Sequence, residues 1–152
     1  MSSVAEWIRD RVDTSRTTVG LFAGDVAAIT LFVVLGELSH GIDPTAVPGY
    51  VITNTLSPFL VGWLLVSIPV GMYGPATDDS RSKLALRTAG AWFLADVVAQ
   101  VIRATPYIKG GASLENIVVF GLVSFTVGGT LLVFWRVGTA VVTARRRSTA
   151  LA

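Results

Sequence analysis

The sequence predicts an all-α integral membrane protein, a bundle of four membrane-spanning helices. Only 14% of its 152 residues are charged and the mean hydropathy is +0.65, whereas soluble domains carry about a quarter charged residues. The charges stand in short clusters between long apolar runs, and an unbroken apolar run of about 18 residues is typical of a membrane helix. These runs do not alternate as the strands of a membrane barrel do. We therefore expect a multi-pass membrane protein.

The predicted membrane domain covers residues 17–143, with spans near residues 17–38, 56–74, 84–104 and 114–137. Asp25 interrupts the first span and Asp96 the third, while the apolar core of the fourth carries no charge. Pro69 lies inside the second span, where a proline is expected to kink the helix.

Two tails flank this domain. Residues 144–152 form a basic C-terminal tail, and residues 1–16 form an N-terminal tail in which Val4, Trp7, Ile8 and Val12 have helical spacing. The N-terminal tail could therefore form a short helix at the membrane interface, or it could fray.

Lysine and arginine gather at one end of the predicted spans, and this bias sets orientation under the positive-inside rule. Ten of the 12 basic residues share one side: Arg9, Arg11, Arg16, Arg81, Lys83, Arg87, Arg136, Arg145, Arg146 and Arg147. Arg103 and Lys109 lie on the other side. We therefore expect a protein of the cell membrane with both termini in the cytoplasm, and a net charge of +2 that reflects topology rather than nucleic-acid binding.

The first and third spans share a pattern that indicates an internal duplication. Arg16-Thr17 is followed nine residues after the arginine by Asp25, and Arg87-Thr88 is followed at the same distance by Asp96. A phenylalanine, a valine and an alanine also recur at matching positions of the two segments. We expect two helical hairpins related as a parallel repeat, with both aspartates at equal depth.

Asp25 and Asp96 are the candidate functional residues because an ionisable group inside a membrane helix is costly and is usually functional. In one interpretation they are protonation or ion sites on a pathway for a small solute. In the other they accept hydrogen bonds from neighbouring helices and lock the helix packing. The sequence leaves both interpretations open.

Gln100 and Arg103 follow Asp96 at helical spacing, so the three side chains form one polar stripe along the third span. This stripe could line an aqueous cavity. Alternatively, Arg103 could extend outward from the end of the helix towards water.

Glu37 and His40 have E-x-x-H spacing at the far end of the first span. Metal sites in helical bundles need two such pairs and further carboxylates, and this chain has one histidine. We therefore expect a hydrated loop or a helix-end contact, and no metal site.

Small residues at helical spacing predict close helix packing within the chain, or between two copies of it. They are Gly20 and Gly24 in the first span, and Gly121 and Gly128 in the fourth.

Six short motifs, spread in order over residues 19–137, resemble those of a known protein family. They are Gly24-Asp25, Leu35–Gly41, Pro58–Trp63, Arg103–Pro106, Gly110-Gly111 and Trp135-Arg136. In this order they resemble the small four-span membrane proteins grouped as domain of unknown function 3054. The resemblance implies a multi-pass membrane protein, and it supplies no activity, ligand or catalytic residue.

The functional expectation is a small oligomeric transporter or permeation unit for a small solute or ion. The alternative is a membrane scaffold or accessory subunit whose aspartates serve only packing. The chain lacks cysteine and the common phosphate-binding and nucleophile motifs. We therefore expect no enzyme activity and no cofactor. The lipid bilayer and a second copy of the chain are the expected partners.

Overall fold

A computed structural model describes residues 3–75, 79–108 and 113–150. The predicted all-α membrane fold is confirmed, because four helices of the described chain are long and apolar enough to span a bilayer. The helices are α1 (Val4–Arg11), α2 (Arg16–Ser39), α3 (Pro48–Val51), the π-helical turn η1 (Ile52–Leu56), α4 (Ser57–Ser67), α5 (Arg81–Arg103) and α6 (Leu114–Ala150). Helices α3, η1 and α4 join end to end, and together they form the second span, Pro48–Ser67.

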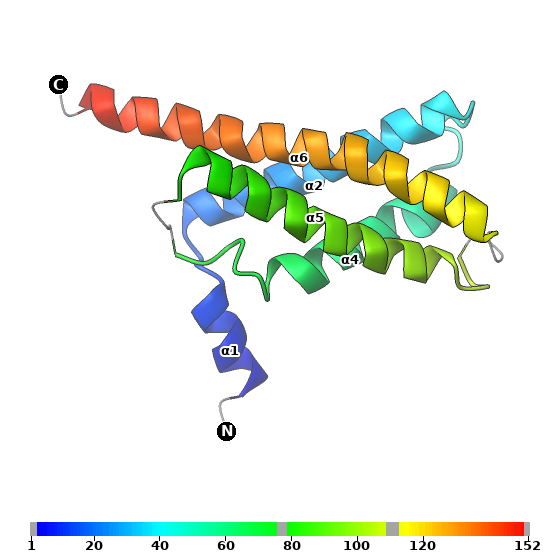
Figure 1. Ribbon diagram of the computed structural model, residues 1–152, viewed down its shortest axis with the longest axis horizontal. Coiled ribbons are helices and arrows are strands. Elements are labelled where there is room, and N and C mark those ends of the chain that lie inside the picture. Colours follow the sequence, from blue (N-terminus) through cyan, green and yellow to red (C-terminus); the bar gives the residue numbers. More distant parts are fainter. Residues whose placement is uncertain (1–2, 76–78, 109–112, 151–152) are drawn as a thin grey trace.

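The four spans lie side by side, and α5 packs against both α4 and α6 (Figure 1). Helix α2 packs mainly along α6. Helices α2 and α5 run in the same direction, while α4 and α6 run back. The core between them holds four large aromatic side chains: Phe32, Phe59, Trp63 and Trp92. Phe59 and Trp92 stack with their ring centroids 5.7 Å apart.

The second span begins and ends earlier than the predicted 56–74, and Pro69 does not kink it. The reason is Gly71, which has φ +74, a conformation that favours glycine. The Met72 N–H donates to the Ser67 carbonyl and the Gly71 N–H donates to the Ile68 carbonyl. This pair of hydrogen bonds is the Schellman motif, which ends helices. Pro69 therefore lies in the closing turn.

The π-helical turn η1 lies immediately before Pro58. Proline has no backbone N–H and its ring crowds the carbonyl one turn before it. The wider turn instead lets the Ser57 N–H donate to the Ile52 carbonyl. The change of register also places the buried Thr55 against α2.

Helix α6 continues without a break to Ala150 and contains 37 residues. At 1.5 Å per residue it is about 56 Å long, far more than a bilayer core of about 30 Å. Arg145, Arg146 and Arg147 therefore stand on a helical extension of the fourth span rather than on a separate tail.

The N-terminal tail is helical from Val4 to Arg11, and Ser3 and Glu6 form a capping box at its start. Helix α1 projects away from the bundle (Figure 1). Trp7 and Ile8 are exposed on it, which suits a helix at a membrane interface. Its placement at the interface stays a prediction.

Two of the four predicted packing glycines, Gly24 and Gly128, lie where a neighbouring helix approaches closely. An added Cβ at Gly24 would meet the Trp135 ring, and one at Gly128 would meet the Trp92 ring at 2.5 Å. Gly121 faces Gln100. Gly20 has open space around it, so its predicted packing role is not met within this chain.

The expectation that the two aspartates lie at equal depth is wrong. Asp25 pairs with Arg136 of α6, whereas Asp96 bonds to Ser124 of the same helix. These partners are 12 positions apart, about 18 Å along the helix axis. The duplication itself is not tested by this result and stays a prediction.

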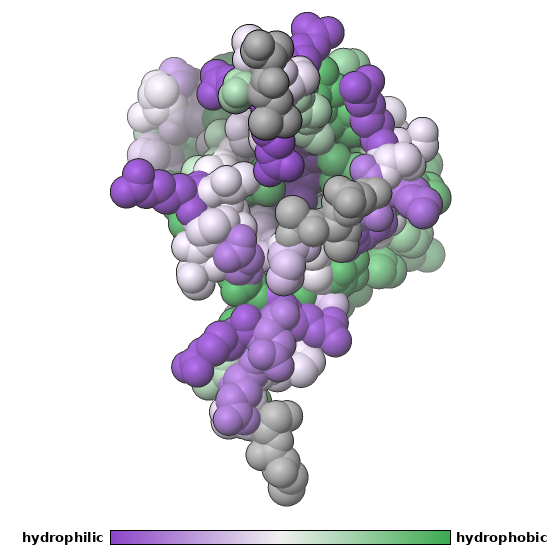
Figure 2. Space-filling view, turned by 90° about the vertical axis from the view of Figure 1, so that its left-hand side faces the viewer, coloured by the Kyte–Doolittle hydropathy of each residue, from purple (hydrophilic) through white to green (hydrophobic). Residues whose placement is uncertain are grey.

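Nine of the ten basic residues assigned to one side belong to α1, to the first turns of α2 and α5, and to the last turns of α6. These segments lie toward the same end of the bundle (Figure 1), the end at which hydrophilic residues gather (Figure 2). The tenth, Arg136, is 3% exposed inside the bundle. It is therefore an interior charge and not a marker of orientation. Arg103 is buried as well, and Lys109, Gly110 and Gly111 lie outside the described residues.

Candidate functional site: a buried ion pair and two cavities

A buried ion pair joins the first and last spans. Arg136 Nε donates to Asp25 Oδ1 at 2.9 Å, and Arg136 Nη2 donates to Asp25 Oδ2 at 2.5 Å. Asp25 is fully buried. The Arg136 Nη1 atom donates to the Met72 carbonyl at 3.2 Å, so the chain beyond α4 also holds the guanidinium. This fork geometry is the strongest form of an arginine–carboxylate contact.

Two aromatic side chains complete what we call the Asp25 network: Asp25, Trp63, Tyr73 and Arg136. The Tyr73 hydroxyl donates to Asp25 Oδ2 at 2.5 Å and accepts a hydrogen bond from Trp63 Nε1 at 2.8 Å. The network connects α2, α4, the segment after α4 and α6. With its charge neutralised and its oxygens bonded, Asp25 is suited to holding these helices together.

Asp96 has a different environment, which we call the Asp96 cluster: Asp96, Gln100 and Ser124. Gln100 Nε2 and Ser124 Oγ donate to Asp96 Oδ1 at 2.8 and 2.7 Å. No basic side chain lies within ion-pair distance of Asp96 among the described residues. Asp96 thus differs from Asp25, because no cation neutralises it directly.

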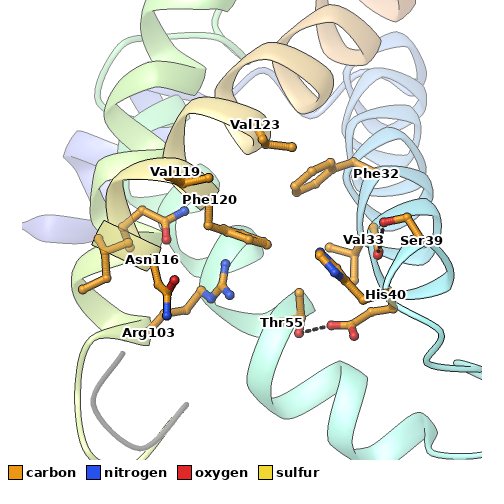
Figure 3. A pocket seen from close by; sticks show the side chains of 14 residues that line it. Phe32, Val33, Ser39, His40, Thr55, Arg103, Asn116, Val119, Phe120 and Val123 are labelled. Carbon is orange, nitrogen blue, oxygen red and sulfur yellow. Dashed lines mark hydrogen bonds between the residues drawn. The ribbon is translucent and has the colours of Figure 1, made fainter. Parts of the chain in front are cut away.

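A cavity of about 580 Å³ lies between α2, α5, α6 and η1, at the end of the bundle away from α1. We call it the Arg103 cavity. Its apolar walls come from α2 and α6, with Phe32, Val33, Phe120 and Val123 among them. Phe32 and Phe120 face each other across it (Figure 3). The volume falls within the usual range of small-molecule sites, about 300–1,000 Å³.

Arg103 points into this cavity (Figure 3) and is 9% exposed. The expectation that it extends outward to water is therefore wrong. Its guanidinium lies 3.6 Å from the centroid of Phe120 and 5.8 Å from that of Phe59. Its Nε and Nη1 atoms have no hydrogen-bond partner within the described part of the chain. The aromatic faces attract the cation, but they leave these donors unsatisfied.

The cavity also brings together two groups of residues that the sequence analysis singled out separately. Gln100 and Arg103 of the polar stripe line it, as do Glu37 and His40 from the end of α2. Glu37 is 5% exposed and accepts a hydrogen bond from Thr55 of η1. His40 is exposed and points into the cavity (Figure 3). No group of three metal-ligating side chains is found among the described residues.

A second cavity of about 540 Å³ lies at the opposite end of the bundle, and we call it the Arg136 cavity. Thr17 and Leu21 of α2, Arg87 of α5 and Ala140 of α6 are among the residues that line it. Arg136 also lines it, so the Asp25 network closes its inner end.

The sequence analysis missed Arg136, Tyr73, Trp63 and Thr55 as parts of these sites. A signal was available for Arg136, because a buried aspartate in one span needs a cation from another, and Arg136 is the basic residue nearest the apolar core of the fourth span. The others depend on tertiary contacts and on the π-helical turn, neither of which a sequence pattern specifies.

Comparison with known protein families matches residues 22–139 to the family described as "Protein of unknown function (DUF3054)". No curated protein and no solved structure matches the chain. The match begins within the first span and ends within the fourth, and it includes the Asp25 network, the Asp96 cluster and the described lining of the Arg103 cavity. The chain, whose four long apolar helices indicate a multi-pass membrane protein, therefore belongs to the DUF3054 family.

Proposed function

We propose that the protein is a small membrane transporter that moves a small solute between the Arg103 cavity and the Arg136 cavity. The observation that carries the proposal is the arrangement of these cavities at opposite ends of one bundle. On each of α2, α5 and α6, the residues that line one cavity are separated from those that line the other by a stretch that lines neither cavity and contains fully buried side chains. This arrangement suits a carrier, which must admit solute from either side of the membrane while the path between the two sides stays closed.

The closed layer consists of large, fully buried side chains. Ile29 of α2, Trp92 of α5 and Leu132 of α6 are each 0% exposed. On α6, the cavity linings end at Val123 and resume at Trp135, about 18 Å apart along the helix. A solute can cross this layer only when the helices move relative to one another.

The two aspartates have different roles in this proposal. Asp25 is held by Arg136 and Tyr73, so it stabilises the closed arrangement. Asp96 lies beside Gln100, which lines the Arg103 cavity, and no cation pairs with it in the described chain. Asp96 is therefore the residue that we assign to proton coupling, should transport be coupled to protons.

We further propose that both termini lie in the cytoplasm and that the chain acts as a homo-oligomer in the cell membrane. The nine basic residues at the α1 end of the bundle support the orientation. Four spans provide few helices to enclose a solute path, which supports assembly of two or more copies.

The alternative function, a membrane scaffold or accessory subunit, is favoured by the Asp25 network, because a fully bonded ion pair needs no role beyond packing. It offers no explanation for two cavities or for the unsatisfied donors of Arg103. Because the scaffold function leaves the cavities and Arg103 unexplained, we propose transport as the function. We also propose that the protein is not an enzyme.

The test is solute uptake by proteoliposomes that contain the full chain. Three radiolabelled panels are used: small carboxylates, small amines and neutral polar solutes. We expect saturable uptake of one panel above that of protein-free liposomes. Uptake of no panel above the protein-free rate would contradict transport and leave the scaffold function. The matched variant is Asp96→Asn, whose amide oxygen can still accept from Gln100 and Ser124. We expect it to fold and to remove any dependence of uptake on a pH gradient.

A further inference from the structure

We propose that the Arg103 cavity binds a monoanionic carboxylate that carries an apolar body, with the carboxylate paired to the guanidinium of Arg103. This inference deepens the proposed function by naming a substrate class, and it rests on the same cavity. Its test is a binding measurement, so it can fail or succeed independently of transport.

Arg103 is buried and has hydrogen-bond donors that no described residue satisfies. The side chain is 91% buried, yet Nε and Nη1 have no hydrogen-bond partner within the described residues. A buried charged group without hydrogen-bond partners destabilises the folded protein. Arg136 in the same bundle avoids this cost, because two nitrogens of its guanidinium donate to the Asp25 carboxylate. Arg103 Nε and Nη1 are not bonded to any carboxylate of the described residues.

The second argument is that the protein's own carboxylates do not satisfy Arg103. Glu37 lines the same cavity, but it accepts from Thr55 and lies beyond ion-pair distance of Arg103. Asp96 is engaged by Gln100 and Ser124. An external anion is therefore the partner that fits the guanidinium, which is a natural match for a planar carboxylate.

The third argument concerns the charge and shape of the ligand. The negative charge of Glu37 in the cavity opposes a second negative charge on the ligand, which favours a monoanion over a phosphate monoester or a dicarboxylate. The walls formed by Phe32, Val33, Phe120 and Val123 suit an aromatic or aliphatic body. The volume of about 580 Å³ leaves room for such a body beside the carboxylate.

The test uses isothermal titration calorimetry on the purified full chain in a non-ionic detergent. Benzoate is the main probe, with benzylamine and inorganic phosphate as comparisons. We expect benzoate to bind, Arg103→Gln to weaken that binding about tenfold or more, and Arg81→Gln to leave it unchanged. Arg81 is an exposed arginine at the other end of the same helix.

A second variant keeps the test valid if Arg103→Gln fails to fold. Glu37→Gln retains an oxygen acceptor for Thr55 but removes the negative charge. We expect it to tighten benzoate binding by about two- to tenfold, a gain that misfolding cannot produce. Absence of benzoate binding to the native chain, equal binding by Arg103→Gln, or unchanged or weaker binding by Glu37→Gln overturns the proposal. Tighter binding of benzylamine or phosphate than of benzoate also overturns it.

The carboxylate could come from water or from the bilayer. Competition between benzoate and decanoate distinguishes these sources. If a low concentration of decanoate displaces benzoate, the natural ligand is a fatty acid drawn from the membrane. If decanoate displaces benzoate only weakly, the natural ligand is a water-soluble acid. Both results support the carboxylate site. Benzoate binding without uptake would contradict the transport proposal alone, whereas uptake of another solute panel without benzoate binding would contradict this inference alone.

Discussion

Asp25 on α2 and Arg136 on α6 form a two-point ion pair across 111 positions of the chain, with nitrogen–oxygen distances of 2.9 and 2.5 Å. Both side chains are buried, so removal of one charge leaves the other without compensation. We expect Asp25→Asn to lower the free energy of unfolding by about 3–5 kcal/mol. The measurement is unfolding in mixed micelles, followed by tryptophan fluorescence.

Two further variants test the cause of that loss. The double variant Asp25→Leu with Arg136→Met removes both charges, so we expect it to be more stable than Asp25→Asn. Asp79→Asn alters the Arg87–Asp79 ion pair, which is far less buried than the Asp25–Arg136 pair, and is expected to cost less than about 1 kcal/mol. Equal losses for Asp25→Asn and Asp79→Asn would show that the buried pair has no special role.

The Tyr73 hydroxyl connects the ion pair to Trp63. In Tyr73→Phe, the buried Trp63 Nε1 loses its acceptor and Asp25 loses a donor. We expect a loss of about 1–3 kcal/mol and a change in the near-ultraviolet circular dichroism of the tryptophans. Tyr107→Phe is the matched control, because Tyr107 is 92% exposed. A Tyr73→Phe protein as stable as the Tyr107→Phe protein would contradict the network.

Gly62 permits the close approach of α4 to α5. A Cβ at this position would overlap the Ala95 carbonyl oxygen, and a backbone atom cannot move aside easily. We expect Gly62→Ala to destabilise the protein by about 1–3 kcal/mol. Gly90 of α5 has open space around it, so Gly90→Ala should be neutral or stabilising by up to about 1 kcal/mol. Equal losses of stability in Gly62→Ala and Gly90→Ala would contradict this prediction.

The connection between α2 and α3 should respond to acid. The side-chain hydroxyl and the backbone N–H of Thr45 hold the pKa of Asp43 below its ordinary value of 3.8. A lowered folded-state pKa means that the contribution of Asp43 to stability is present above pH 3.8 and disappears as the pH falls through the folded-state pKa. Carbon-13 NMR of the Asp43 carboxyl should therefore give a midpoint below pH 3.8, and Asp43→Asn should remove that transition. A midpoint at or above 3.8 would contradict the hydrogen-bonded turn.

The spans could be predicted because hydropathy depends only on local sequence. Their ends were predicted less well, since the Schellman turn at Gly71 and the π-helical turn before Pro58 depend on specific backbone hydrogen bonds. Helical spacing places Gln100 and Arg103 along one face of α5, but it left open whether Arg103 turns into a cavity or outward, because the Phe120 ring that contacts it lies on another helix. The pairing of Asp25 with Arg136 could not be derived from either span alone.

The proposed function requires two separate water-accessible cavities at opposite ends of the bundle. The chain has no cysteine, so a single introduced cysteine reports on the water access of its own position. Gly36→Cys marks the Arg103 cavity, because Gly36 is partly exposed and has room for a side chain, and Ala140→Cys marks the Arg136 cavity. Phe134→Cys is the control, because Phe134 is 75% exposed on α6 and lines neither cavity.

The most direct measurement is labelling of these variants in intact cells and in inverted vesicles with a small membrane-impermeant methanethiosulfonate. We expect Gly36→Cys to react in intact cells and Ala140→Cys to react in inverted vesicles, while Phe134→Cys reacts in neither. Labelling of Gly36→Cys and Ala140→Cys from the same side, or protection of both from both sides, would contradict the two-cavity arrangement.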